Sequence, residues 1–236
     1  MTQQEQPPPP RARRGRPRKA DAPAAREAIL DSAEALFAAH GLHGVTLREV
    51  ARGANVDGAL LHYYFESKRG LFDAVFRRRA EPLNQARLAA LNAYEEAMGD
   101  DVSVEGALQA FLSPVLGAAN TADQGWLNYF SLVAQVSNTP EWGGETMARF
   151  FDPVVHRLLQ VLRRALPEAR EADLYWSYHM LSGALMLTLS ESGRLDILSG
   201  GACRSTDMEQ AQSHMIAFAT AGFHAACPSP RSAASE

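Results

Sequence analysis

Cysteine is scarce in this sequence, and the two that occur, Cys203 and Cys227, belong to no CxxC or Cys/His framework. That pattern excludes a disulfide scaffold and a zinc module of the usual spacing, and two free thiols suit a reducing cytosol. Apolar runs are short as well: none reaches the roughly 20 residues that cross a bilayer. The basic start of the chain also lacks the apolar stretch of a signal peptide. We expect a cytoplasmic protein without a membrane partner.

The sequence motifs that accompany catalysis are missing too. There is no glycine-rich phosphate loop, no nucleophile elbow and no HExxH motif. Asp152 and His156 stand four residues apart, which puts both on one helical face and could begin the metal site of an enzyme. Because no third ligand stands nearby in the sequence, a salt-linked surface pair is the favoured interpretation. We expect no enzyme activity, no metal and no cofactor.

Period-two alternation, the pattern of a half-buried strand, is absent, and apolar residues recur at helical spacing instead. The first set lines one helical face and is followed by Gly41, which is placed to end the helix. That set is Ile29, Leu30, Ala33, Leu36 and Phe37. The sequence therefore predicts an amphipathic helix that stops before residue 41.

A second helix is expected to begin near Thr46. The run from Thr46 to Glu49 matches the S/T-x-x-E capping box, in which both side chains satisfy backbone N–H groups at a helix start. The helix is expected to break between Gly53 and Asn55, because asparagine tolerates the left-handed conformation of a tight turn. Asp57 is then placed to cap a third helix, Gly58 to Tyr64.

The third helix has the composition of a helix that reads DNA. Leu61 and Phe65 share one face, whereas the polar aromatics at 62–64 point largely elsewhere, and so short a helix cannot bury all three. Two helices joined by a short turn, the second presenting its side chains outward, form a helix-turn-helix whose second helix enters the major groove. The alternative is that Tyr63 and Tyr64 are core or dimer aromatics.

The same segment resembles the DNA-binding domain of the TetR family of bacterial transcriptional regulators. The resemblance is carried by Arg26 to Leu36 with Phe37, Gly41, Thr46, Val50-Ala51, Val56, Leu61 to Phe65, Ser67-Lys68 and Leu71. It implies that Thr46 and Arg48 contact backbone phosphates and that His62 and Tyr63 lie in the major groove. It also implies that Tyr64 and Lys68 hold flanking phosphates. The other residues expected at the DNA are Asn55, Asp57, Gly58, Ala59 and Leu60.

Three of these positions depart from the residues usual in the family. Asn55 replaces Gly, Leu60 replaces Thr or Ser, and His62 replaces Tyr. Without a hydroxyl at position 60, one phosphate or base contact loses its usual donor, and an exposed His62 would make base preference partly dependent on pH. The operator sequence therefore does not transfer from relatives.

Residues 1–22 are predicted to form a disordered basic arm. Residues 3–10 are polar and rich in proline and cannot bury a core. The run from Arg14 to Pro17 resembles the core of an AT-hook, whose arginines enter a narrow A·T minor groove. The alternative is a solvated tail that binds phosphates without preference. Either interpretation puts four side chains on DNA: Arg14, Arg16, Arg18 and Lys19.

Charge is divided unevenly along the chain, whose net charge is −4. Residues 1–20 hold six basic residues and one acidic residue, residues 21–80 hold eight of each, and residues 81–236 hold nine basic and 18 acidic residues. An acidic remainder repels a phosphate backbone. Only the N-terminal third is therefore expected to touch DNA.

The sequence predicts an all-α chain whose remaining part is long enough for a second domain. After the arm we expect a helix-turn-helix DNA-binding domain at 23–68, a helical ligand-binding and dimerisation domain at 69–227 and a disordered tail at 228–236. A helix starting beyond Ser67 is expected to kink or end at Pro82. Further helices are expected at about Val104–Ala119, Gln124–Ser137, Glu145–Leu166, Arg170–Ser192 and Thr206–Ala226.

Two interior prolines, Pro114 and Pro153, favour a cavity, because bends at proline open space between neighbouring helices. Large apolar groups around them suit a lipophilic ligand, although a filled core needs the same residues. Segments 77–98 and 150–192 are similar to TetR-type repressors induced by long-chain fatty acids or acyl-CoA esters. The ligand-binding residues expected are Phe111, Val115, Trp126, Tyr129, Phe130, Val133, Phe150, Phe151, Val154, Trp176, His179, Met180 and Gly183.

The last two long helices carry small residues, among them Gly183 and Gly222, that allow helices to approach closely. In the family this region is the dimer contact. A two-fold dimer places its recognition helices about 34–36 Å apart and requires a palindromic operator. We expect a homodimeric repressor that a hydrophobic effector releases from DNA. The alternative is a DNA-binding regulator without small-molecule input.

Overall fold

The computed structural model of the protein describes residues 22–121 and 123–227; the predicted basic arm and C-terminal tail lie outside these residues. All regular structure in the described part is α-helical, as predicted. The helices are α1 (Ala22–His40), α2 (Leu47–Gly53), α3 (Gly58–Phe65), α4 (Lys68–Met98), α5 (Val104–Ala119), α6 (Gln124–Ser137), α7 (Gly143–Ala165), α8 (Glu171–Leu189), α9 (Arg194–Leu198) and α10 (Met208–Ala226).

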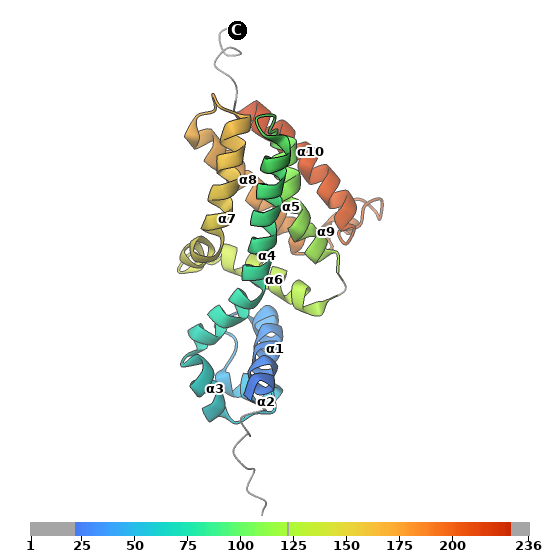
Figure 1. Cartoon of the computed structure of the whole chain (residues 1–236). Helices are drawn as coiled ribbons and strands as arrows, with labels where there is room; N and C mark the ends of the chain where they lie inside the picture. Colours follow the sequence, from blue (N-terminus) through green and yellow to red (C-terminus); the bar gives the residue numbers. More distant parts are fainter. Residues whose placement is uncertain (1–21, 122, 228–236) are drawn as a thin grey trace, which may run out of the picture.

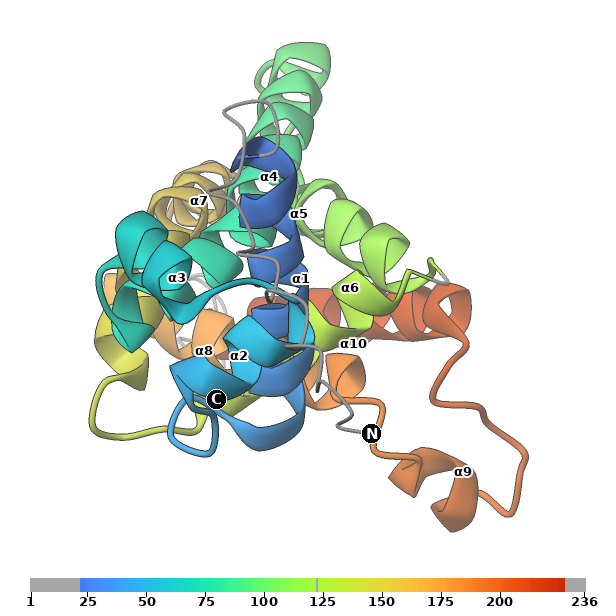
Figure 2. The same ribbon diagram turned by 90° about the horizontal axis from the view of Figure 1, so that it is seen from below.

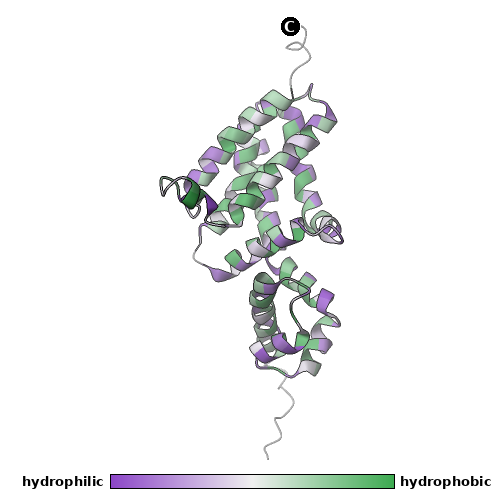
Figure 3. Cartoon of the chain, turned by 180° about the vertical axis from the view of Figure 1, so that it is seen from behind, coloured by the Kyte–Doolittle hydropathy of each residue, from purple (hydrophilic) through white to green (hydrophobic). Residues whose placement is uncertain are grey.

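The molecule is elongated and has two parts (Figure 1). We call α1–α3 the head and α4–α10 the body. Helix α4 leaves the head obliquely and rises through the body, where α5 and α7 pack against it, while α6 crosses between the two parts. Helix α10 packs on α5 and α8. The short α9 projects away from the body, and a loop joins it to the start of α10 (Figure 2). The view coloured by hydropathy shows apolar and polar residues on different sides of the long helices (Figure 3).

The head folds around the apolar face predicted for its first helix. Phe37 of α1, Val50 of α2 and Leu61 of α3 are fully buried, and the Phe37 ring meets the edge of Phe72 of α4 at 5.4 Å between centroids. Because a single buried aromatic contributes about 1.5–3 kcal/mol by leaving water, this cluster fixes the head on the first turns of α4. The head and α4 therefore share one core.

Local signals at the helix ends act as the sequence predicted. The Thr46 hydroxyl accepts from the backbone N–H of Glu49 at 3.3 Å, and the Glu49 carboxylate accepts from the N–H of Thr46 at 2.8 Å, which completes the capping box. Gly41 ends α1 with φ of 69°, and Asn55 takes φ of 54° in the turn. Asp57 caps α3, since its carboxylate accepts from the N–H of Ala59 at 2.8 Å.

An end of the helix at Pro82 is wrong: α4 continues through this residue for 31 residues in total. Proline removes only one backbone hydrogen bond here. Packing on both sides offsets that loss, because Ala80 and Leu83 are buried against the rest of the molecule. The predicted bounds of α5 and α6 agree with the structure, whereas the five-residue α9 was not predicted. Among the described helices, none is long and apolar enough to span a membrane.

Candidate nucleic-acid interface and ligand cavity

No residue among 22–121 and 123–227 covers the outer side of α3. Leu61 and Phe65 are buried beneath the helix, while the Tyr63 side chain is 78% exposed and His62 is exposed beside it. The Tyr63 ring touches only the edge of Tyr64, at 5.2 Å between centroids. Tyr63 is therefore no core aromatic of this chain, and α3 presents an aromatic and an imidazole to the surroundings.

Tyr64 and Lys68, expected at phosphates, both make hydrogen bonds inside the head. The half-buried Tyr64 donates its hydroxyl hydrogen to the Ala22 carbonyl at 3.0 Å, and the Lys68 ammonium donates to the Val45 carbonyl at 3.0 Å. Tyr64 thus has part of the core role of the alternative interpretation. Lys68 keeps two further N–H donors, because an ammonium has three. A phosphate contact by Lys68 is compatible with its internal bond, whereas Tyr64 has a single hydroxyl hydrogen and donates it to the Ala22 carbonyl instead.

The other expected DNA residues surround α3. Thr46 and Arg48 are exposed at the start of α2, and Asn55 and Asp57 are exposed in the turn. Gly58 and Ala59 form the first turn of α3, while Leu60 is half-buried. The Asp57 carboxylate already serves as the cap of α3. Positions Arg14, Arg16, Arg18 and Lys19 lie outside the described residues.

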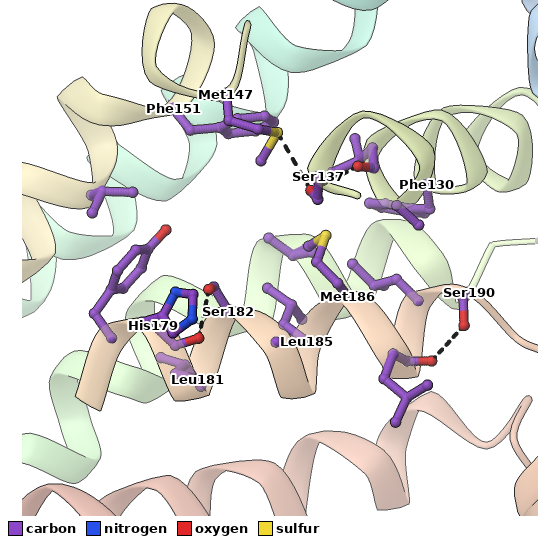
Figure 4. Close-up of a pocket in the computed structure, with 18 of the residues that line it drawn as sticks. Phe130, Ser137, Met147, Phe151, His179, Leu181, Ser182, Leu185, Met186 and Ser190 are labelled. Atoms are coloured by element: carbon purple, nitrogen blue, oxygen red, sulfur yellow. Dashed lines mark hydrogen bonds between the residues drawn. The ribbon is translucent and has the colours of Figure 1, made fainter. Parts of the chain in front are cut away.

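A cavity of about 670 Å³ opens in the body between α4, α5, α6, α7 and α8. Figure 4 shows Met186 of α8 facing it, with Phe130 and Ser137 of α6 and Met147 and Phe151 of α7 across from α8, and a hydrogen bond that joins Ser137 to Met147. The volume lies within the range of sites for drug-sized ligands, about 300–1,000 Å³. Eight expected ligand-binding residues line it: Phe111, Val115, Tyr129, Phe130, Val133, Phe151, His179 and Gly183.

Five expected ligand-binding residues do not line this cavity. Trp126 lies under the Arg79 guanidinium at 5.0 Å, Phe150 packs on Phe76 at 5.0 Å, and Val154 is buried in the core. Trp176 and Met180 are exposed on a different side of α8. The reason is helical geometry: α8 is apolar around most of its circumference, so that spacing alone does not say which side faces inward.

Arg87 of α4 is the residue of this cavity that the sequence analysis missed. It is 5% exposed, donates Nε–H to the Phe111 carbonyl at 3.2 Å and lies over the Phe111 ring at 3.7 Å. Burial lowers its pKa to about 10. A signal was present, because Leu83, Arg87 and Leu91 follow one another at intervals of four residues and put an arginine on the buried stripe of α4.

The Asp152–His156 pair does not form a metal centre within the described residues. Both side chains are exposed on α7, and Asp152 lies at the edge of the cavity. No group of three histidine, cysteine, aspartate or glutamate side chains in residues 22–121 and 123–227 is arranged to hold a metal ion. The pair has the spacing of a metal motif without the third ligand.

A second apolar surface covers α8 and α10. Trp176 is 63% exposed, Met180 is 61% exposed and Phe218 of α10 is 74% exposed. Together they border a groove of about 270 Å³ whose floor includes Ala184, Ala219 and Gly222. We call this the α8–α10 face. The small residues that the sequence analysis singled out allow another helix to approach this face closely.

Polar contacts join the head to α6 of the body. Arg79 of α4 pairs with Glu34 of α1 at 3.2 Å and with Asp123, the N-cap of α6, at 3.3 Å. At the other end of α6, Gln135 donates to the Ala38 carbonyl of α1 at 2.7 Å. Since Tyr129, Phe130 and Val133 of α6 line the cavity, α6 touches both the cavity and the head, as α4 does.

Comparison with known proteins agrees with this division. Residues 29–75 match the model of bacterial regulatory proteins of the tetR family, and residues 109–222 match the tetracyclin repressor-like C-terminal domain. The biofilm operon icaADBC HTH-type negative transcriptional regulator IcaR of Staphylococcus aureus is 28% identical over 116 residues, which cover 49% of this chain and 55% of IcaR. The HTH-type transcriptional regulator BetI of Rhizobium meliloti is 38% identical over 71 residues, 30% of this chain and 35% of BetI. The chain thus spans about half the length of IcaR and less of BetI.

Solved structures share the fold over nearly the whole chain. SmeT, the repressor of the Stenotrophomonas maltophilia multidrug efflux pump SmeDEF, superposes with a TM-score of 0.58 at 20% identity and covers 85% of this chain and 91% of SmeT. HlyIIR, a hemolysin II transcriptional regulator, gives a TM-score of 0.53 at 17% identity, covering 82% of this chain and 97% of HlyIIR. From the two matched domains and the exposed helix-turn-helix, the chain belongs to the TetR family and is a DNA-binding transcriptional regulator.

Proposed function

We propose that the protein is a homodimeric, cytoplasmic repressor that binds a palindromic operator and leaves it when a hydrophobic small molecule enters the body. The observation that carries the proposal is the uncovered outer side of α3, whose Tyr63 and His62 have no partner in the core. In this proposal residues 23–68 bind DNA and residues 69–227 bind the ligand and the second subunit. We assign no catalytic role, and none to Asp152 and His156.

We assign the proposed DNA contacts from the position of each side chain on the head. Tyr63 and His62 would read base edges, while Thr46, Arg48 and Lys68 would hold phosphates. Tyr64 would donate to a phosphate only by giving up its bond to the Ala22 carbonyl. Residues Asn55 to Leu60, which form the turn and the start of α3, would lie against the DNA backbone next to these contacts. The basic arm would add phosphate or minor-groove contacts through its arginines and Lys19.

The dimer would form through the α8–α10 face. An exposed apolar surface that contains Trp176, Met180 and Phe218 marks a protein contact more often than a solvated surface. Two such faces related by a two-fold axis would make a four-helix interface. The two heads would then reach successive major grooves on one side of the duplex.

Release would proceed through the two helices that touch both the cavity and the head. A ligand among α4–α8 would displace α6 and α4. Gln135, which bonds to Ala38, and Arg79, which pairs with both Asp123 and Glu34, would pass that displacement to α1. The separation of the two heads would change and the operator would be released. Coupling of this kind is typically about 1–3 kcal/mol and is reciprocal, so that operator DNA weakens ligand binding by the same factor.

The proposal is tested by selecting genomic fragments that the purified protein retains and by titrating the selected duplex. We expect a palindrome, bound by a dimer. Fatty acids, acyl-CoA esters and hydrophobic drugs are then compared by thermal melting, since a compound that binds the native state raises the transition. Active compounds should release the duplex. No preference for any duplex over random competitor would overturn the proposal, and a regulator without small-molecule input predicts no melting shift with any compound.

A further inference from the structure

Arg87 is a charge inside the body with no acidic partner among the described residues. Its Nε–H bonds to the Phe111 carbonyl and its Nη1 reaches the Asn84 side-chain oxygen at 3.4 Å, whereas Nη2 has no hydrogen-bond partner there. The arginines of the head junction differ: Arg78 and Arg79 both pair with the buried carboxylate of Glu34. A buried cation without a counter-charge is costly, and replacement by an apolar residue is often neutral or stabilising.

A second polar group of the cavity is also left without a partner. The Tyr129 hydroxyl is buried and makes no hydrogen bond within the described residues, and it lies close enough to Arg87 for their charges to interact. Tyr178 of α8 lines the same cavity and also lies near this guanidinium. A hydroxyl that is removed from water without a partner costs about 1–3 kcal/mol. A buried guanidinium and an unpaired buried hydroxyl therefore lie near each other in the wall of one cavity.

Asp152 and His179 are the other charged or basic side chains of the wall, and Asp152 lies near Tyr178, as Arg87 does. Asp152 and His179 are exposed, and Arg87 is the one lysine or arginine among the described lining residues. A single cation balances one negative charge. The rest of the wall, from Phe111, Phe130 and Met186 among others, offers apolar contact.

We propose that the cavity binds an amphiphilic monoanion, a carboxylate with an apolar body, whose carboxylate pairs with Arg87 and accepts from the Tyr129 hydroxyl. The inference rests on the proposed function, because it names the ligand class of the same cavity. It distinguishes a free carboxylic acid, ionised at neutral pH, from neutral lipophiles such as alcohols and esters. Charge-assisted bonds from a planar guanidinium suit a carboxylate in geometry as well as in charge.

The test is displacement of the neutral fluorescent probe N-phenyl-1-naphthylamine from the full-length protein by matched acids and alcohols of 8 to about 16 carbons, a span set by the cavity's drug-sized volume. We expect carboxylates to displace the probe at concentrations at least about tenfold lower than the alcohols of equal length, as a charged hydrogen bond predicts. Equal potency of acids and alcohols would overturn the inference, while the lipophilic cavity of the proposed function would stand.

Variants locate the effect. Arg87→Met should still bind the probe but lose the tenfold preference for acids, whereas Arg77→Met, an exposed arginine on the same helix paired with Glu81, should keep it. Arg87→Lys should retain part of the preference because it retains the charge, and Tyr129→Phe should weaken acids several-fold and leave alcohols unchanged. If Arg87→Met fails to fold, Arg87→Gln, which keeps a donor, replaces it. An acid preference that survives loss of the charge at 87 would overturn the inference.

The two proposals fail in different ways. A protein that binds no probe and releases operator DNA with no compound refutes the small-molecule input itself, and this inference with it. A protein that binds the probe and releases DNA with neutral compounds only leaves the proposed function intact and refutes the carboxylate. Acids that bind and release DNA through Arg87 support both.

Discussion

The head and the body both expose aromatic side chains, but the surroundings of these side chains differ. Tyr63 lies on α3 beside the exposed His62 and contacts the ring of Tyr64, whose hydroxyl bonds to the Ala22 carbonyl. Trp176 stands on α8 beside Met180 and Phe218, above a groove lined by alanine and glycine. A tyrosine among polar groups suits a charged partner whose interface holds ordered water. A cluster of large apolar side chains suits an interface from which water is excluded. The same residue class therefore indicates DNA in one part and a second protein surface in the other.

The largest effect should come from a charge introduced into the α8–α10 face. Phe218→Glu places a charge in the centre of the α8–α10 face, so that the protein should become monomeric and its operator affinity should fall more than about 100-fold, or about 2.7 kcal/mol. Analytical ultracentrifugation and fluorescence anisotropy measure the two quantities. Ile197→Glu is the matched control, because Ile197 is 84% exposed on α9 and does not line this groove. A dimer that persists in Phe218→Glu would move the interface elsewhere.

The junction between the two parts should be next in size. Glu34→Gln leaves the Arg78 and Arg79 guanidinium groups without their buried carboxylate, which accepts from them at 2.6 and 3.2 Å. Because both arginines keep some solvent contact, we expect a loss of about 2 kcal/mol in the free energy of unfolding, below the full cost of a buried pair. Urea denaturation measures it. Glu27→Gln, at an exposed carboxylate 3.6 Å from Arg78, should change stability by less than about 0.5 kcal/mol.

A substitution on the outer side of α3 should have a smaller effect. Tyr63→Ala should weaken operator binding about tenfold, or about 1.4 kcal/mol, and leave the melting temperature unchanged, because the ring packs on little but Tyr64. Tyr175→Ala, at an exposed tyrosine of α8, is the control and should bind DNA normally. Loss of folding in Tyr63→Ala would show a structural role for this ring.

The smallest effect concerns the pH dependence of the body's stability. Hydrogen bonds from Arg157 and Arg164 lower the pKa of Glu95 on α4. A lowered pKa means that this carboxylate stabilises the fold above its unfolded pKa of about 4.3, and that the contribution is lost as the pH falls through the folded value. Glu95→Gln should therefore flatten the decline of the free energy of unfolding below about pH 4.5, by less than about 1 kcal/mol. Urea denaturation at a series of pH values measures it. The exposed neighbour Glu96 provides the control, Glu96→Gln, whose profile should match the wild type.

Most of the head could be predicted from sequence because its signals are local. The capping box at Thr46, the cap at Asp57 and the left-handed Asn55 each depend on residues within a few positions of one another. The body's helices were predictable for the same reason. The inward side of α8 was not, since Trp176 and His179 are three residues apart and only packing against α10 and α6 decides which faces the cavity.

Arg87 and α9 escaped prediction for different physical reasons. An arginine in a helical pattern is usually solvated, and only the tertiary arrangement of α5 over α4 buries this one. Helix α9 has five residues between glycines, too short for a periodic pattern, and it buries none of them. Sequence periodicity detects long helices with one apolar face. A single buried arginine and a five-residue helix do not produce that pattern.

One consequence follows from the unbroken course of α4 past Pro82. About 15 residues separate Leu83 at the cavity from Lys68 at the head, which is roughly 22 Å of helix at 1.5 Å per residue. A rotation of about 10° about the cavity end therefore carries the far end by roughly 4 Å, more than the separation of two adjacent base pairs, about 3.4 Å. In the proposed mechanism, a ligand that rotated α4 in this way would put both reading helices out of step with the double helix while the head's own core stayed intact.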